Sequence, residues 1–231
     1  MTRIITLIIS MLFSIAVFAQ NGALTMEIVD ASSTDSQVAT QLEMMKGTKI
    51  SVSYMGEKSL TKMNMMGGLI NVDVKMSENG DMDMYMDMMG QKMWIPSTKA
   101  ELDLAKAEAG ASDPEFVYDE SDIKEIAGFQ CYKVTMTNPD AEGFKLEAYI
   151  TEDIKANAAV IQGVDISAFK GFPLEYTITN SAPNMNLKFT TTDSSNEVDA
   201  AVFDVKTAGY TKMTMEEFQS LLGGAAGGFG F

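Results

Sequence analysis

The sequence predicts a mainly β fold with a few helices, organised as one continuous domain. Three observations support this prediction. Apolar and polar residues alternate with a period of two in many short segments, turns rich in Gly and Asn separate these segments, and two capping boxes mark helix starts. About 210 residues remain after the N-terminal leader described next, which is enough for one sizeable hydrophobic core.

The N-terminus has the features of a cleavable signal peptide. Arg3 supplies a positive charge, residues 4–18 form an almost unbroken apolar stretch, and Ala19 ends a small-residue cleavage site. The apolar stretch is shorter than the roughly 20 residues that a membrane-spanning helix needs. The residue directly after the cleavage point is Gln20 and not a cysteine, so the lipid attachment of a lipoprotein is not expected. We therefore expect residues 1–19 to be removed and the protein to be periplasmic or secreted, without stable membrane insertion.

The first half of the mature chain predicts a strand, a short helix and then an antiparallel meander. Residues 23–29 predict the strand, and Thr34 or Asp35 caps a helix that ends at Gly47. From residue 49 onward the alternation is typical of strands, and tight Gly and Asn-Gly turns indicate hairpins. The strands expected in this meander are 50–54, 59–66, 69–76, 82–88 and 92–95.

Two capping boxes predict the remaining helices. Thr98 and Glu101 begin a helix that runs through Ala109, and Thr214 and Glu217 begin a second one. This second helix is expected to run through Leu222 and to end at Gly223.

The second half predicts further hairpins that continue the same domain. Residues 152–169 look helical or irregular, and residues 223–231 form a Gly-rich tail that we expect to be flexible. No charge block or long linker divides residues 20–222, so they are predicted to form a single domain. The strands expected in this half are 115–118, 123–126, 129–138, 144–151, 174–180, 184–192 and 198–203.

The composition excludes several classes of function. The chain has 32 acidic and 17 basic residues, a formal net charge of -15, and no His. Such an acidic domain repels nucleic acid, so no nucleic-acid partner is expected. Without His, catalytic triads and imidazole metal sites are ruled out, and acid-base chemistry would fall to carboxylates, Lys, Tyr or the single cysteine. We assign no catalytic residue, no cofactor and no metal ligand.

Methionine dominates the segment 81–88, where Asp and Met alternate strictly. In a strand, Met82, Met84, Met86 and Met88 project from one face and the acidic residues from the other. Thioethers are soft and flexible, which suits an adaptable apolar cavity, coordination of Cu(I) or Ag(I), or an ordinary core. Successive same-face residues lie about 6.6 Å apart in a line, which favours a cavity or core over a metal site.

The only cysteine, Cys131, lies in an expected strand. It cannot form an internal disulfide, and two interpretations stay open: a buried core residue or a reactive thiol. Lys133 is the one cation that the sequence places beside it.

Three stretches resemble the DUF4412 family of exported bacterial proteins, which is similar to the GLPGLI proteins and more distantly to the LolA/LolB-like lipoprotein carriers. Residues 126–134, Ile-Ala-Gly-Phe-Gln-Cys-Tyr-Lys-Val, are similar to the "I-x-G-[YF]-x-C-x-K" stretch of these families, residues 171–175 to their "G-[LF]-P" stretch, and residues 45–52 lead into a similar meander. The resemblance implies a curved antiparallel sheet, an open LolA-like half-barrel with helices on its concave side.

Together these observations favour a non-enzymatic exported binding protein that accepts an acyl chain or another apolar group in a Met-lined concave sheet. The expected partner is a lipid or a lipidated protein, and no oligomeric state is predicted. Two alternatives stay open: a soft-metal binder, and a structural envelope or surface protein without a small ligand. The Phe-terminated tail suggests the second, although residues 223–228 lack the alternation of a barrel strand. The expected wall residues are Met82, Met84, Met86, Met88, Leu69 and Trp94.

Overall fold

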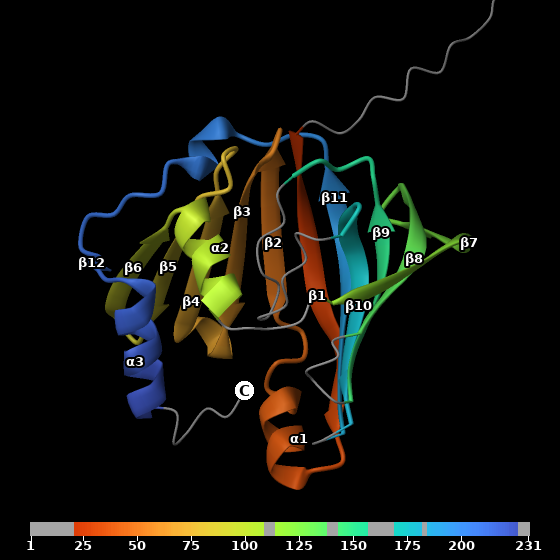
Figure 1. Cartoon of the computed structure of the whole chain (residues 1–231), viewed down its shortest axis with the longest axis horizontal. Helices are drawn as coiled ribbons and strands as arrows, with labels where there is room; N and C mark the ends of the chain where they lie inside the picture. The colour runs from red at the N-terminus through yellow and green to blue at the C-terminus, as the bar shows by residue number, and fades with distance from the viewer. Residues whose placement is uncertain (1–20, 109–113, 138–142, 157–168, 182–183, 226–231) are drawn as a thin grey trace, which may run out of the picture.

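The computed structural model describes residues 21–108, 114–137, 143–156, 169–181 and 184–225, and the strands in these ranges form one twelve-stranded sheet. The sheet is curved and open, and the order of its strands is β12-β6-β5-β4-β3-β2-β1-β11-β10-β9-β8-β7 (Figure 1). This architecture confirms the predicted fold class. The strands are β1 (Asn21–Ser33), β2 (Lys49–Met55), β3 (Lys58–Met65), β4 (Ile70–Met76), β5 (Met82–Met88), β6 (Gln91–Ser97), β7 (Glu115–Ile126), β8 (Phe129–Thr137), β9 (Phe144–Thr151), β10 (Phe172–Asn180), β11 (Met185–Ser195) and β12 (Thr211–Lys212).

Most strands lie where the alternation predicts them, but the short strand β12 was not predicted, and two predicted segments differ from the structure. The segments expected at 115–118 and 123–126 are one strand, β7, because a register shift between Asp119 and Ile123 absorbs the polar residues between them. The segment 198–203 is not a strand. It contains the short 3₁₀ helix η2 (Ala200–Phe203), because the Asp199 side chain accepts a hydrogen bond from the Ala201 backbone N–H at 2.9 Å.

The helices begin at the predicted caps. Helix α1 (Ser36–Glu43) is capped by Asp35, whose side chain accepts hydrogen bonds from two backbone N–H groups. Both capping boxes are formed: Thr98 and Glu101 exchange hydrogen bonds before α2 (Lys99–Glu108), and Thr214 and Glu217 do so before α3 (Met215–Ala225). A further 3₁₀ turn is η1 (Met66–Gly68). No helix within the described ranges is long and apolar enough to span a membrane.

Three predicted features fall wholly or partly outside the described residues. The predicted signal peptide, residues 1–19, lies outside them entirely. Of the segment 152–169, which is expected to be helical or irregular, residues 157–168 are not described. The expected tail begins at Gly223, but α3 continues through Ala225, and residues 226–231 lie outside the described ranges.

Strand β1 joins the two halves of the sheet. Its residues pair with β2 on one side and with β11 on the other, both antiparallel, so that Met26 lies opposite Ile50 and Ile28 lies opposite Phe189. Strands β2 to β6 and strands β7 to β11 thereby become one surface. Two register shifts in β1 against β11 bend the strand at this junction.

The register gives the sheet an inner, apolar face and an outer, polar face. On the inner face, one row of directly paired residues crosses β8, β9, β10, β11 and β1, and each of its members is at most 2% exposed. The three helices of the described ranges pack against this face through Leu42 of α1, Leu102 of α2 and Phe218 of α3. Figure 1 shows α2 and α3 over the sheet and α1 at its lower end. The row consists of Val134, Ala148, Tyr176, Phe189 and Ile28.

We predict that the two neighbouring residues Ile28 and Val29 differ sharply in their contribution to stability. The Ile28 side chain is fully buried at the junction, whereas Val29 is 46% exposed in the same strand. Replacing Ile28 by Ala should lower the free energy of unfolding by about 2–5 kcal/mol, and Val29→Ala by less than about 1 kcal/mol. Urea unfolding of the two variants measures the difference; equal losses would contradict the assigned faces.

Candidate functional site

The alternating segment around residue 84 forms β5, and its four methionines share the inner face. Strand β5 pairs with β4 and β6, so that Met86 lies opposite both Val72 and Met93, and Met84 lies opposite both Val74 and Ile95. The prediction that Met and Asp occupy opposite faces of this strand agrees with this register.

Methionines from neighbouring strands extend this surface, which we call the methionine face. A second row of paired inner-face residues, from Met26 on β1 to Met93 on β6, includes Met63 and Met86. Two more methionines, one just before α3 and one at its first position, pack against the same clusters. The methionine face comprises Met63, Met65, Met76, Met82, Met84, Met86, Met88, Met93, Met213 and Met215.

Burial varies across the methionine face. Met82 and Met93 are 5% and 6% exposed and form its floor, whereas Met84, Met86 and Met88 are only partly buried. Helix α3 contributes Phe218, which packs with Met93 and Ile95. The centre of the face is therefore apolar, sulfur-rich and incompletely covered by the described side chains.

Two predicted wall residues lie elsewhere. Trp94 lies opposite Tyr85 on the outer face, where its indole N–H donates a 2.8 Å hydrogen bond to Asp83 Oδ1, so the expectation that it lines the methionine wall is wrong. Leu69 precedes β4 at the end of the β3–β4 connection and is 52% exposed. In this position it contributes to the rim of the sheet and not to the wall.

Trp94 instead belongs to an aromatic cluster on the outer face. Its ring is parallel to that of Tyr85, and Tyr85 also forms a T-shaped contact with Tyr210 at a centroid distance of 5.6 Å. Lys212 lies over the Trp94 ring and Lys92 over the Tyr210 ring. The cluster attaches the segment leading to β12 to the outer side of β5 and β6.

One buried oxygen on the inner face, the hydroxyl of Tyr176, has no hydrogen-bond partner within the described part of the chain. The Tyr176 ring stacks on Phe189 with centroids 4.3 Å apart and is 2% exposed, and among the described residues nothing accepts or donates a hydrogen bond at its hydroxyl. Burial raises the pKa of this phenol well above its usual value, so the hydroxyl stays protonated and can donate. It is a polar group within an otherwise apolar surface.

The outer face of the second half carries a network of charges centred on Glu175. Its carboxylate accepts hydrogen bonds from Lys124 at 2.7 and 2.8 Å and from Thr190 at 3.1 Å, and Lys188 lies 3.3 Å away. Burial opposes ionisation, but the hydrogen bond and charge of Lys124 and the charge of Lys188 outweigh it, so the pKa of Glu175 is lowered. The sequence analysis missed this group because its partners lie far apart in the chain.

Cys131 has the properties of a core residue. It is 1% exposed, and burial raises the pKa of its thiol to about 12. Its burial and raised pKa favour the core interpretation over a reactive thiol. Within the described ranges, no group of three or more Asp, Glu or Cys side chains is arranged to hold a metal ion.

We predict that Tyr176→Phe leaves the stability of the ligand-free protein unchanged or raises it by about 1 kcal/mol, because it removes a buried hydroxyl that has no partner among the described residues. The matched control is Tyr149→Phe, which removes a 3.0 Å hydrogen bond to Asp122 and should cost about 0.5–1.5 kcal/mol. Chemical denaturation measures both. A loss in the Tyr176 variant as large as in the control would show that its hydroxyl has a partner.

We predict that Glu175 contributes a pH-dependent part of the stability. Because its pKa is lower in the folded state, this contribution is fully present above the unfolded pKa of about 4.3 and is lost as pH falls through the folded pKa. The difference in free energy of unfolding between the wild type and Glu175→Gln should therefore shrink below about pH 4. Unfolding curves between pH 3 and 7 test this expectation, with the exposed Glu57→Gln as control; a difference that does not change with pH would contradict it.

Sequence comparisons identify no family: no family model and no curated protein matches the chain. The resemblance to the DUF4412 family accordingly stays a prediction.

Similar solved structures come from several bacteria. The chain is similar to MucB in the MucA/MucB complex of Pseudomonas aeruginosa, with 12% identity over 87% of this chain and 61% of that chain and a TM-score of 0.35. It is similar to a domain from Vibrio parahaemolyticus described as an outer membrane lipoprotein-sorting protein (11% identity, 80% and 90% covered, TM-score 0.37). It is also similar to the Mycobacterium tuberculosis lipoprotein LppX (10% identity, 77% and 88% covered, TM-score 0.33). The chain spans less than two thirds of the length of MucB, and similarities this low carry no inference about function.

Proposed function

We propose that the protein is a non-enzymatic exported binding protein that holds an apolar ligand, such as an acyl chain, against its methionine face. One observation supports this proposal above the others. Met84, Met86 and Met88 lie on the concave, helix-bearing side of the sheet, yet their side chains are only partly buried. A residue that served only the core would be expected to lose nearly all of its exposure there.

The chemistry of methionine suits such a ligand. Its unbranched, polarisable side chain adapts to apolar partners of different shape. A chain of about ten methylenes would gain roughly 0.8 kcal/mol for each one buried, which leaves a net affinity after the cost of ordering the ligand. Apolar area is therefore the main source of binding energy in this proposal.

The partner would be a lipid or a lipidated protein encountered outside the cytoplasm, after removal of residues 1–19. The composition supports a role without catalysis, since the chain has no His and its single cysteine is buried.

Polar substitutions on the methionine face test the proposal. We predict that the double variant Met84→Gln/Met86→Gln binds a fluorescent long-chain fatty acid at least about tenfold more weakly than the wild type, because two amides must be desolvated without partners. The control Met89→Gln changes an 81% exposed methionine in the adjoining turn and should bind as the wild type does.

Native mass spectrometry of the protein purified from its own cell envelope provides a second measurement. A bound mass in the lipid range, lost after mild organic extraction, is the expected result. A wild-type protein that binds no fatty acid and carries no such mass would overturn the proposal and favour a structural protein without a small ligand.

A further inference from the structure

We propose that Met86, Met93, Met213 and Met215 form a thioether site for a soft monovalent cation, Cu(I) or Ag(I), at the edge of the methionine face. This inference goes beyond the proposed function, because the ligand is a metal ion and the binding groups are sulfur atoms. A single strand cannot make such a site, since its same-face methionines lie about 6.6 Å apart in a line. The structure packs methionines from β5, from β6 and from the segment around the start of α3 against one inner-face cluster.

The first two ligands come from a pair of directly opposed strand residues. Met86 on β5 and Met93 on β6 are register partners on the inner face. The Cβ atoms of such cross-strand partners are about 4.5–5.5 Å apart. Because a methionine side chain is long and has three rotatable bonds, both sulfur atoms can turn toward one point between them.

The C-terminal segment supplies the other two. Strand β12 runs parallel to β6 with Thr211 opposite Met93, and the Met213 N–H donates a 3.0 Å hydrogen bond to the Trp94 carbonyl. Alternation along this extended segment places Met213 on the inner face with Met93, and Met215 begins α3 two residues later. Both pack against the cluster that contains Met93.

The chemistry of the chain selects soft ions at this position. Thioethers are neutral soft ligands that need no deprotonation, and they favour Cu(I) and Ag(I) over hard cations. The chain has no His, and Cys131 is buried with its thiol held protonated by a raised pKa. The methionine sulfurs are therefore the soft ligands left for such an ion.

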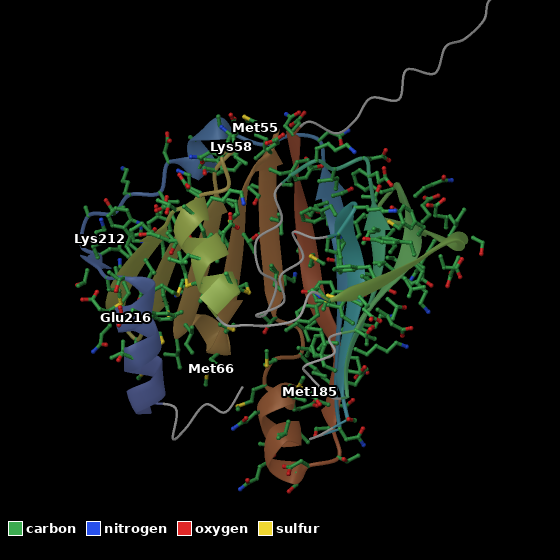
Figure 2. The ribbon with its side chains drawn as sticks, viewed as in Figure 1. Met55, Lys58, Met66, Met185, Lys212 and Glu216 are labelled. Atoms are coloured by element: carbon green, nitrogen blue, oxygen red, sulfur yellow. The ribbon has the colours of Figure 1, made fainter. Side chains whose placement is uncertain are left out.

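Access and charge also favour a cation. Met86, Met213 and Met215 are partly exposed, so an ion can enter from their side, with the buried Met93 below. Glu216 follows Met215 in the exposed first turn of α3 (Figure 2), and the chain has a net charge of -15. These charges raise the local concentration of cations near the site.

Titration with silver nitrate, followed by native mass spectrometry and isothermal titration calorimetry, tests the proposal without any reductant. The wild type should bind one Ag(I) ion per chain. The double variant Met86→Leu/Met215→Leu, which keeps the surface apolar, should bind it at least about tenfold more weakly. The matched control Met44→Leu/Met89→Leu removes two exposed methionines outside the site and should bind as the wild type does.

Three results would overturn the proposal: no Ag(I) binding by the wild type, equal losses in the two double variants, or unchanged binding in the site variant. Circular dichroism of each variant confirms that it is folded. The fatty-acid assay separates this proposal from the proposed function, because Met→Leu variants keep an apolar surface. If the Met86→Leu/Met215→Leu variant loses Ag(I) binding but keeps fatty-acid binding, the two ligands depend on different chemistry. If the wild type binds no Ag(I), this proposal fails and the proposed function is unaffected.

Discussion

The pairing of β1 with β11 is the interaction on which the rest of the structure depends. Without it, strands β2 to β6 and strands β7 to β11 would be two separate meanders, each with a small and poorly covered apolar face. The ladder from Ala23 opposite Ser195 to Ser33 opposite Met185 joins them into one surface with one concave side. Its contacts link residues far apart in the sequence, so forming them costs loop-closure entropy. The burial of apolar side chains along β1 offsets this cost, since Leu24, Met26 and Ile28 are at most 2% exposed.

Alternation then gives the two faces different chemistry. Along the row that contains Met93, the inner face is apolar from β1 to β6. The adjacent outer row contains Trp94, Tyr85, Asp73 and Lys62, with the last two forming a 3.6 Å ion pair. A shift of one residue in the register of any of these strands would move its inner-face side chains to the outer face and its outer-face side chains to the inner face. Methionines would then be exposed and charged groups buried. The same constraint that fixes the register therefore keeps the methionine face on the helix-bearing side.

Local signals predicted much of this fold. The caps at Asp35, Thr98 and Thr214 and the alternation of β5 depend on neighbours within four residues, and they agree with the structure. The position of Trp94 was also open to prediction, since the two-residue Met89-Gly90 turn fixes the register and pairs residue 85 with residue 94. The contacts of Glu175 could not be predicted from the sequence. Its partner Lys124 belongs to β7, and no local pattern in the sequence specifies the position of that strand in the sheet.

The outer face also determines what the inner face can bind. Tyr210 packs against Tyr85, and Lys212 lies over Trp94, so the C-terminal segment is held on the outer side of β5 and β6. From there it passes the β6 edge as β12 and brings Met213 to the inner face. Figure 2 labels Lys212 in β12 and Glu216 in the first turn of α3. The aromatic cluster thus sets the place at which the segment crosses the edge, and with it the position of α3 over the methionine face. Trp94, which the sequence analysis assigned to the wall of the methionine face, therefore lies on the other side of the sheet. There it holds the segment that brings Met213 to the methionine face.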